Sequence, residues 1–411
     1  MAVLNNNLKM IDRPIWEQCT SAIGNSAAGS CMVDDGERFI YYLLAANSFW
    51  AYDTWSDTWQ QLASAPGGTV AAGTCIRFVR EMGSQENGVV YGSVYALIAS
   101  GTTVTFYRYN IGNNTWTAAL SVTGVPATFG TDGRLTCVEP AINAYQGGYH
   151  SAVSLNTVTL TATASPGATT LAVAALPLGL PASAVLNFGT YQAPKWAVLT
   201  AAAAASATSL TVSPLVSSIE SASVSYWYAD MFLFGNASST FYRYNITGNQ
   251  WFTTSANAAN PALAAVPGTA GAGTIAAWLP GSGDANALDR IILFRGTATS
   301  SAYEYSLSSN TWSTLTFYPS TDTFSSGTSS AVRSTSGKNA KLVLGKDTTG
   351  RFYQFDREAH RMTPLATQSL VASGAAVVGD KSAMLMSPDG IEFLYVIPST
   401  STFLMRTGMI L

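Results

Sequence analysis

The chain has 411 residues, of which 47% are hydrophobic and only 10% are charged. Its formal net charge is −3, and the basic residues form no stripe, which excludes a nucleic-acid-binding surface of the usual kind. Aromatic residues make up 11% of the chain, which excludes intrinsic disorder. No apolar stretch has the roughly 18 residues of a membrane helix, and the first residues lack the apolar core of a secretory signal. We therefore expect a folded protein with no membrane or nucleic-acid partner, whose neutral surface is partly covered by other subunits.

Residues 1–28 precede the first of several repeats. Pro14 lies within Ile11–Gln18, a segment with the character of an edge strand. In the repeats described below, the last large apolar residue of each repeat lies at a similar distance before the start of the next repeat. Trp16 lies at this distance before the first repeat. Two interpretations are open: the segment pairs with the last repeat and closes a ring, or it is an arm that docks on a neighbouring subunit. Trp16 is accordingly a candidate contact residue.

A short phrase recurs along the chain, in which one large apolar residue is followed seven positions later by another. Asn, Asp, Ser and Gly lie between the two anchors, which is the pattern of a hairpin turn between two strands. The anchors are Tyr52 and Trp59, Tyr109 and Trp116, Tyr244 and Trp251, Tyr305 and Trp312, and, in two divergent copies, Phe355 and Met362, and Val396 and Phe403. We expect these anchors to pack in the core rather than to form a ligand cage.

A glycine followed by mostly small residues precedes each phrase, and an apolar run lies between this glycine and the first anchor. These glycines are Gly29, Gly73, Gly133, Gly273, Gly327 and Gly374. Each unit thus contains four short strands, which is the signature of one blade of a β-propeller. Because one blade cannot bury both faces, the units are expected to close into a ring. The sequence predicts an all-β fold, a six-bladed β-propeller formed by residues 29–155 and 229–411.

The third unit is interrupted between its first and second strands by residues 156–228. Within this insertion Ala164–Pro177 resembles Ala202–Leu215, and Thr, Val and alternation favour strands. We expect a small β-sandwich or partly closed barrel. Lys195 and Glu220 are its only formal charges, so it is interpreted as a contact surface, with Tyr191 and Trp196 as possible contact residues.

Other long connections occupy the same place in neighbouring units. Glu81–Gly88 is predicted to be a polar loop in the second unit, and Pro280–Asp289 is its counterpart in the fourth. The long connections are therefore expected on one face of the ring, where any functional residues would gather.

The sequence offers no catalytic or metal-binding constellation. His150 and His360 lie in different repeats, and Glu139 is a single carboxylate where a glycoside-cleaving enzyme needs a pair. The acidic cluster Asp34, Asp35 and Glu37 is interpreted as a solvated turn. The cysteines have no CxxC spacing and are expected to be small buried residues near the ring axis; they are Cys19, Cys31, Cys75 and Cys137. We predict a protein that is not an enzyme, with no cofactor and no metal.

The Tyr-x(6)-Trp phrase, preceded by a strand that ends in Gly, resembles the kelch repeat over most of the chain. Asn114–Trp116 and Asn310–Trp312 match its pattern well, whereas the usual diglycine is reduced to a single Gly235, Gly296 or Gly345. The resemblance implies a kelch-like propeller. Kelch-type oxidases carry a copper site of two His and two Tyr, for which this sequence has no matching context.

The Ala/Thr-rich insertion is similar to small β modules in structural proteins of tailed bacteriophages. This resemblance implies a virion structural protein of the tail, baseplate or head–tail joint, assembled in the host cytoplasm. Its partners would be other virion structural proteins, in a homo-oligomer or multi-subunit assembly. The alternative is a receptor- or glycan-binding propeller module, which would use aromatic residues on loops; the candidates are Tyr145, Tyr149, Tyr191 and Trp196.

Overall fold

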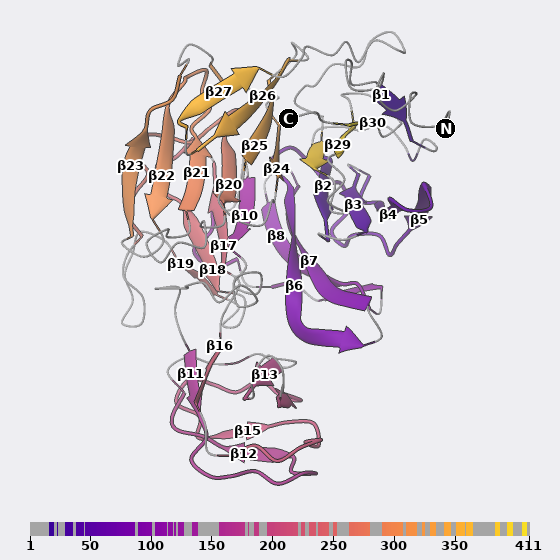
Figure 1. Cartoon of the computed structure of the whole chain (residues 1–411), viewed down its shortest axis with the longest axis vertical. Helices are drawn as coiled ribbons and strands as arrows, with labels where there is room; N and C mark the ends of the chain where they lie inside the picture. Colours follow the sequence, from indigo (N-terminus) through magenta and orange to yellow (C-terminus); the bar gives the residue numbers. More distant parts are fainter. Residues whose placement is uncertain are drawn as a thin grey trace, which may run out of the picture.

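The computed structural model of the chain is all-β, and Figure 1 shows its strands grouped into sheets. It describes residues 16–19, 23, 29–35, 38–44, 46–86, 89–100, 103–112, 114–117, 119–120, 122–126, 134–138, 156–176, 180, 185–188, 195–220, 223–226, 230–235, 237–245, 250–252, 263–279, 290–306, 310–318, 323–324, 329–333, 341–346, 351–357, 359–364, 383–386, 393–397 and 405–408. These residues contain no helix, and hence none that could cross a membrane.

The described residues form six antiparallel sheets of four strands each and three sheets of two strands. The first sheet contains β2 (Cys31–Asp34), β3 (Phe39–Leu43), β4 (Phe49–Asp53) and β5 (Thr58–Gln61). The second contains β6 (Cys75–Glu86), β7 (Val89–Ser100), β8 (Thr103–Asn110) and β9 (Thr115–Trp116). The third contains β10 (Arg134–Val138), β17 (Asp230–Phe234), β18 (Tyr242–Asn245) and β19 (Gln250–Phe252).

The other three four-stranded sheets follow in chain order, except that the sixth includes a strand from the N-terminal end. The fourth contains β20 (Ile275–Leu279), β21 (Arg290–Phe294), β22 (Ala302–Ser306) and β23 (Thr311–Leu315). The fifth contains β24 (Ser329–Arg333), β25 (Lys341–Lys346), β26 (Arg351–Asp356) and β27 (Arg361–Pro364). The sixth contains β28 (Ala383–Met386), β29 (Phe393–Ile397), β30 (Met405–Gly408) and β1 (Trp16–Gln18).

The sheets are arranged in a propeller-like ring. The first strand of each sheet lies against the first strand of the next, from β2 through β6, β10, β20 and β24 to β28, and β28 lies against β2. The chain runs outward through each sheet from this inner strand, as the strand orders of the six sheets show. The all-β fold and its propeller-like arrangement are therefore as the repeats predict.

The N-terminal strand joins the far end of the chain. β1 is the outermost strand of the sixth sheet and pairs antiparallel with β30, with Trp16 opposite Thr407 and Gln18 opposite Met405. Directly after β1 the chain reaches the first sheet, where Cys19 is buried against Tyr52 and Ile23 packs at the edge of the same cluster. One short segment thus contacts both the last sheet and the first.

An aromatic contact repeats between neighbouring sheets and forms much of the core. A phenylalanine three residues before the first anchor of one phrase meets the first anchor of the next edge-on. The ring centroids are 4.9 Å apart for Phe49 and Tyr109, 4.8 Å for Phe106 and Tyr244, and 5.1 Å for Phe241 and Tyr305. Edge-on pairs at this spacing contribute about 0.5–1.5 kcal/mol beyond their burial, so the same contact stabilises each junction.

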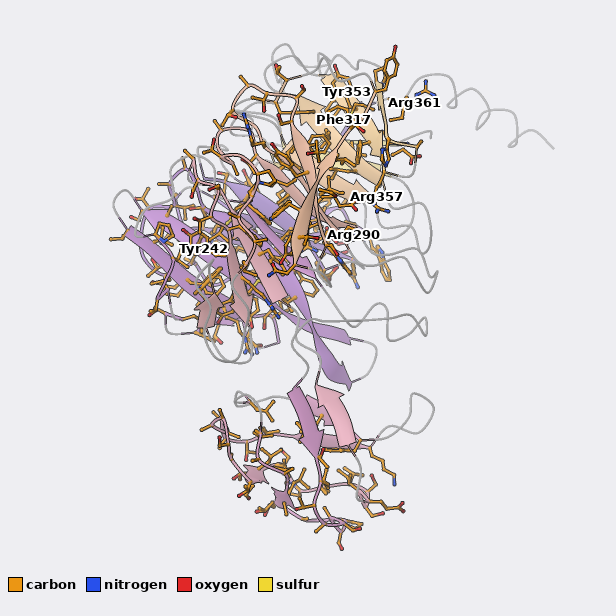
Figure 2. All side chains as sticks on the ribbon, turned by 90° about the vertical axis from the view of Figure 1, so that its left-hand side faces the viewer. Tyr242, Arg290, Phe317, Tyr353, Arg357 and Arg361 are labelled. Carbon is orange, nitrogen blue, oxygen red and sulfur yellow. The ribbon has the colours of Figure 1, made fainter. Side chains whose placement is uncertain are left out.

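The fourth sheet has Ala302 in place of this phenylalanine. Here the space is filled by Phe294, Phe317 and Phe324, and Phe294 meets Phe355 of the fifth sheet at 5.4 Å. Phe317 and Tyr353, both labelled in Figure 2, belong to one hydrophobic cluster that combines residues of the fourth and fifth sheets. The junction between the fourth and fifth sheets is therefore also aromatic, but it is formed by a different set of side chains.

The glycines that precede each phrase have a conformational reason to recur. Gly29, Gly73 and Gly273 have φ values of 93°, 92° and 80°, a region that other residues avoid. Gly133, Gly327 and Gly374 lie outside the described residues.

Between β10 and β17 the chain forms the remaining strands, which we call the 156–226 strands. They are β11 (Asn156–Thr159), β12 (Thr170–Ala172), β13 (Val185–Asn187), β14 (Trp196–Val198), β15 (Ser209–Thr211) and β16 (Ser223–Tyr226). They have a hydrophobic cluster of their own, whose members all lie between Val158 and Ile219. Figure 1 shows them apart from the ring, below the tip of β6 and β7, and β13 lies against β6.

The 156–226 strands contain an internal pseudo-two-fold. Leu171 of β12 and Leu210 of β15 are direct partners at its centre. Ala164 N donates to Ile219 O at 2.8 Å, and the equivalent Ala203 N donates to Leu180 O at 2.8 Å. The resemblance between the two sequence segments of the insertion is therefore a structural repeat. In this repeat Ala203, rather than Ala202, corresponds to Ala164.

Two local predictions were wrong. The predicted loop Glu81–Gly88 is largely strand, because β6 continues to Glu86 and pairs with β7 past an irregularity between Arg80 and Gln85. In the sixth phrase Val396 pairs with Met405 and not with Phe403, so this divergent hairpin has a longer connection.

Candidate functional site

In five of the six phrases the two anchors face each other across a hairpin. The Cα partners are Tyr52 and Trp59, Tyr109 and Trp116, Tyr244 and Trp251, Tyr305 and Trp312, and Phe355 and Met362. The first anchors of these five phrases are buried, and in the Tyr–Trp pairs the rings are 4.9 to 5.1 Å apart. The first anchors are thus core residues, whereas Trp59, Trp116 and Trp312 pack against them and are half-buried.

A turn residue fixes the hydroxyl of the anchoring tyrosine. Tyr109 Oη donates to Asn114 Oδ1 at 2.7 Å, and Tyr305 Oη donates to Asn310 Oδ1 at 2.7 Å. Asp57 accepts in the same way from Tyr52 at 2.6 Å. Asn and Asp tolerate a positive φ better than other side chains, and these three residues have φ values of 53° to 54°.

The same turns bind the preceding sheet. Asn114 Oδ1 accepts a hydrogen bond from Ala63 N at 2.8 Å, and Trp116 Nε1 donates to Ala63 O at 2.8 Å. The fourth sheet repeats this contact, because Asn310 and Trp312 bind the N–H and carbonyl of Ala264 at 3.0 and 2.8 Å. We call this contact the Asn–Trp clamp. It explains in physical terms why Asn and Trp recur two positions apart.

The fifth sheet replaces the clamp with direct backbone pairing. His360 and Met362 stand where the other turns have Asn and Trp, and neither supplies the same side-chain bonds. Instead Tyr318 N donates to His360 O at 3.0 Å and Met362 N donates to Tyr318 O at 2.9 Å. The side chain of Tyr318 is left 78% exposed. His360 therefore belongs to a structural turn.

The indole N–H of the clamp should have a measurable effect on stability. We expect Trp116→Phe and Trp312→Phe each to lower the free energy of unfolding by about 1 kcal/mol, because each leaves a half-buried carbonyl without its donor. Since the two clamps lie in different sheets, the effects should add. Urea unfolding of the single and double variants tests this, with the exposed Trp55→Phe as the control that should change little. A double variant no less stable than the wild type would contradict the clamp.

The hairpin turns and the connections between first and second strands lie on one face of the ring. In each antiparallel sheet the end of the first strand and the end of the third are at the same edge, so both connections leave from that edge. In the first sheet the two are bonded together, because Thr54 N donates to Arg38 O at 3.2 Å. The 156–226 strands arise from the same kind of connection. We call this the turn face.

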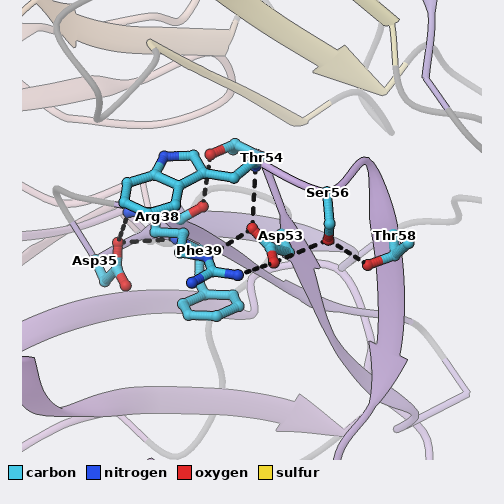
Figure 3. A network of polar contacts seen from close by, with 8 residues as sticks. Asp35, Arg38, Phe39, Asp53, Thr54, Ser56 and Thr58 are labelled. Carbon is cyan, nitrogen blue, oxygen red and sulfur yellow. Dashed lines mark hydrogen bonds and ion pairs between the residues drawn. The ribbon is translucent and has the colours of Figure 1, made fainter. Parts of the chain in front are cut away.

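The first sheet carries a polar network on the turn face (Figure 3). Arg38 Nε donates to Asp53 Oδ1 at 2.8 Å, and its Nη2 binds Oδ2 of the same carboxylate. Asp53 also accepts from Trp55 N at 3.0 Å and from Ser56 Oγ at 2.9 Å. The bond to Arg38 is the main reason that the pKa of Asp53 is held well below its usual range, in spite of the opposing effect of burial.

This pKa shift predicts an acid-sensitive contribution to stability. A carboxyl group with a lowered pKa in the folded state stabilises the fold above its unfolded pKa of about 3.9. The stabilisation is lost as the pH falls further and Asp53 takes up a proton. We expect Asp53→Asn to be less stable than the wild type by roughly 1 kcal/mol at pH 5 to 7, and this difference to shrink below about pH 4. Urea unfolding at several pH values measures it, and a difference that stays constant down to pH 2.5 would refute the assignment.

A second charged group joins the fourth and fifth sheets. Glu304 of β22 forms an ion pair with Arg290 of the neighbouring strand at 3.3 Å. Arg357 Nε, from the turn of the fifth sheet, donates to Glu304 Oε2 at 2.6 Å and its Nη2 to Oε1 at 3.1 Å. Figure 2 labels Arg290 and Arg357 on their two sheets. This group is a junction between sheets and has no second carboxylate of the kind that glycoside cleavage requires.

The possible contact residues named from the sequence are placed only in part. Trp16 lies in β1, opposite Thr407, and Trp196 lies in β14, opposite Asn187. Tyr191 lies outside the described residues, as do Tyr145, Tyr149, His150 and Glu139. Sequence reasoning did not single out Trp55, Arg38 or Asp53, although the tryptophan in the middle of a turn phrase was a signal.

Two of the described cysteines are buried, and so is Asp35, which the sequence placed in a solvated turn. Cys19 and Cys75 are buried and Cys31 is half-buried, whereas the side chain of Cys137 lies outside the described part. Asp35 accepts from the backbone of Arg38 and Phe39, at 2.8 and 3.0 Å, and so shapes the turn. Within the described ranges no group of His, Cys, Asp and Glu is arranged to hold a metal ion.

No protein-family model and no curated protein matches the sequence. Among solved structures, a chain of the "Crystal Structure of Mitotic Checkpoint Complex" is similar, with a TM-score of 0.43 and 11% identity over 96% of this chain and 91% of that one. A structural-genomics protein of unknown function from Bacteroides thetaiotaomicron is similar with a TM-score of 0.43 and 9% identity, over 96% of this chain and 76% of that one. Similarities this weak carry no conclusion about function.

Proposed function

We propose that the ring is a closed, six-bladed, kelch-like propeller and that the 156–226 strands are a domain inserted in its third blade. The six four-stranded sheets, and the contact of β28 with β2, support closure. The pairing of β1 with β30 supports an N-terminal strand that completes the last blade. The separate hydrophobic cluster between Val158 and Ile219 supports an independent domain.

We further propose that the protein is a non-enzymatic assembly protein, and that its setting is a tailed bacteriophage particle. The observation that carries this proposal is the separate cluster of the 156–226 strands, which lets a nearly uncharged body project from a rigid ring. Lys195 and Glu220 are the only formal charges within residues 157–228, so few charges have to be desolvated when this body meets a partner. Its partners would be other virion structural proteins or further copies of the same chain.

A variant without the inserted domain tests the role of that domain. Asn156 and Tyr226 are direct partners at the base of the 156–226 strands, so a short Gly-Ser linker can replace residues 157–225 without stretching the ring. We expect the shortened protein to unfold cooperatively but to be lost from purified particles. Mass spectrometry of particles made with either version measures incorporation.

Two results would contradict the proposal. Absence of the full-length protein from purified particles would exclude a virion component. Normal incorporation of the shortened protein would show that the inserted domain is not the contact surface.

A further inference from the structure

Trp55 occupies a position where folding does not require an aromatic residue. It is the fourth residue of the first phrase, and the equivalent residues of the other phrases on hairpin turns are Gly112, Thr247, Ser308 and Glu358. Those residues are mostly small or polar. Trp55 is 70% exposed, although a tryptophan in a folded chain is normally mostly buried. The hairpin of the first sheet therefore displays a largely exposed indole at a position where the other phrases have no aromatic residue.

The Arg38 guanidinium lies over the rings of both Trp55 and Phe39, and we call this group of side chains the column. The Arg38 guanidinium carbon lies 4.8 Å from the centre of the Trp55 ring and 5.1 Å from that of Phe39. A cation at this distance from an indole face is held by the negative charge of the ring face. Since Arg38 covers one face of Trp55, the exposed area belongs to the opposite face and to the ring edge.

The column is held in place before any ligand arrives. Asp53 binds the guanidinium of Arg38 through both oxygens and accepts from Trp55 N at 3.0 Å. Thr54 Oγ1 also donates to the carbonyl of Arg38 at 2.8 Å, which ties the turn to the neighbouring connection. Because the turn is already ordered, little conformational entropy is lost when something stacks on the indole.

The charges of the column restrict what can bind. The charge of Arg38 is balanced by Asp53, and Asp35 adds a negative charge to the same group, so an anionic ligand is disfavoured. A cationic ligand would stack against a ring whose other face already carries a cation. Ser56 and Thr58 of the same hairpin carry exposed hydroxyl groups, 2.7 Å from one another. These properties favour a neutral ligand that has an apolar ring face and hydroxyl groups at its edge.

We propose that the Trp55–Arg38 column binds the apolar face of a neutral saccharide ring. The axial C–H groups of a pyranose stack on the exposed indole face, while its hydroxyl groups point to water. This activity goes beyond the proposed assembly function and does not depend on it.

Fluorine NMR of protein that contains 5-fluorotryptophan gives a direct test, because each of the ten tryptophans then has its own signal. The Trp55 signal is the one that is missing from the Trp55→Phe variant. The neutral probes are lactose, maltotriose, mannotriose and triacetylchitotriose, and the charged probe is 3′-sialyllactose. We expect at least one neutral probe to shift the Trp55 signal, and sialyllactose to bind more weakly than lactose.

Calorimetry on matched variants completes the test. Trp55→Ala should weaken binding of the neutral probe at least tenfold, and Trp55→Phe should weaken it less. Tyr318→Ala removes another exposed aromatic side chain, away from the column, and should leave binding unchanged. The proposal is overturned if no neutral probe shifts the Trp55 signal, if sialyllactose binds best, or if Trp55→Ala binds as well as the wild type. Circular dichroism confirms that each variant is folded.

Discussion

Deleting residues 1–20 is expected to lower the melting temperature by roughly 5 °C. The deletion removes β1, which pairs with β30 at the outer edge of the sixth sheet. It also removes Cys19 from the cluster that contains Tyr52 in the first sheet. Loss of the strand pairing and of this buried contact should reduce the free energy of unfolding by roughly 3–5 kcal/mol. Differential scanning calorimetry measures the change.

A shorter deletion provides the control. Removing residues 1–10 leaves β1 in place, so the melting temperature should stay within about 2 °C of the wild type. The alternative interpretation, an arm that docks on a neighbouring subunit, predicts a different result. If deletion of residues 1–20 abolished self-association and left the melting temperature unchanged, the closure proposal would be wrong.

Gly296→Ala is expected to reduce the free energy of unfolding by at least about 3 kcal/mol. Gly296 follows β21 with φ at 71°, and a Cβ atom there would lie 2.3 Å from Ala272 O and 2.6 Å from Thr274 N. Both atoms belong to the segment that leads into β20. Thr297 N donates to Ala272 O at 2.7 Å and Thr274 Oγ1 donates to Arg295 O at 3.0 Å, so this backbone cannot move away without losing bonds. Chemical denaturation measures the loss.

Gly68→Ala separates the effect of the steric clash on stability from the effect of the positive φ. Gly68 has a similar φ of 82°, but an added Cβ would meet nothing within 4 Å. We expect this variant to lose only about 1 kcal/mol, the cost of a left-handed conformation for an L residue. Equal losses in Gly68→Ala and Gly296→Ala would show that the close approach of the backbone at Gly296 has no effect.

The sequence predicts the propeller-like fold because its strongest signals are local and repeated. The spacing between Tyr52 and Trp59, and between their counterparts, follows from a hairpin in which the two anchors are direct partners. The glycines recur because a positive φ is required at Gly29, Gly73 and Gly273. Such signals depend on backbone geometry within a few residues and are visible without an alignment.

Contacts between sheets could not be predicted in the same way. The edge-on contact of Phe49 with Tyr109 joins residues far apart in sequence, and only the ring arrangement brings them together. Ala63 gives no signal at all, because the clamp binds its backbone rather than its side chain. The length of β6 was missed because its outer part is polar and irregular, unlike the alternating strands elsewhere.

The Trp55 column was missed for a related reason. Trp55 and Asp53 are part of the first phrase, but Arg38 belongs to the connection between β2 and β3. Only the pairing of β3 with β4 brings Arg38 to the turn. The exposure of Trp55 could not be inferred either, since tryptophans in the other phrases are anchors of the core.

Closure of the ring is the central claim, and a designed cysteine pair tests it most directly. Glu17 of β1 and Arg406 of β30 are direct partners, and partners in antiparallel strands lie about 4.5–5.5 Å apart, which suits a disulfide. We expect Glu17→Cys with Arg406→Cys to form an intramolecular disulfide on mild oxidation of the monomer, identified by mass spectrometry of the linked peptides. If the two cysteines stayed reduced, or linked only different molecules, the N-terminal strand would not complete the sixth sheet and the closed ring would be refuted.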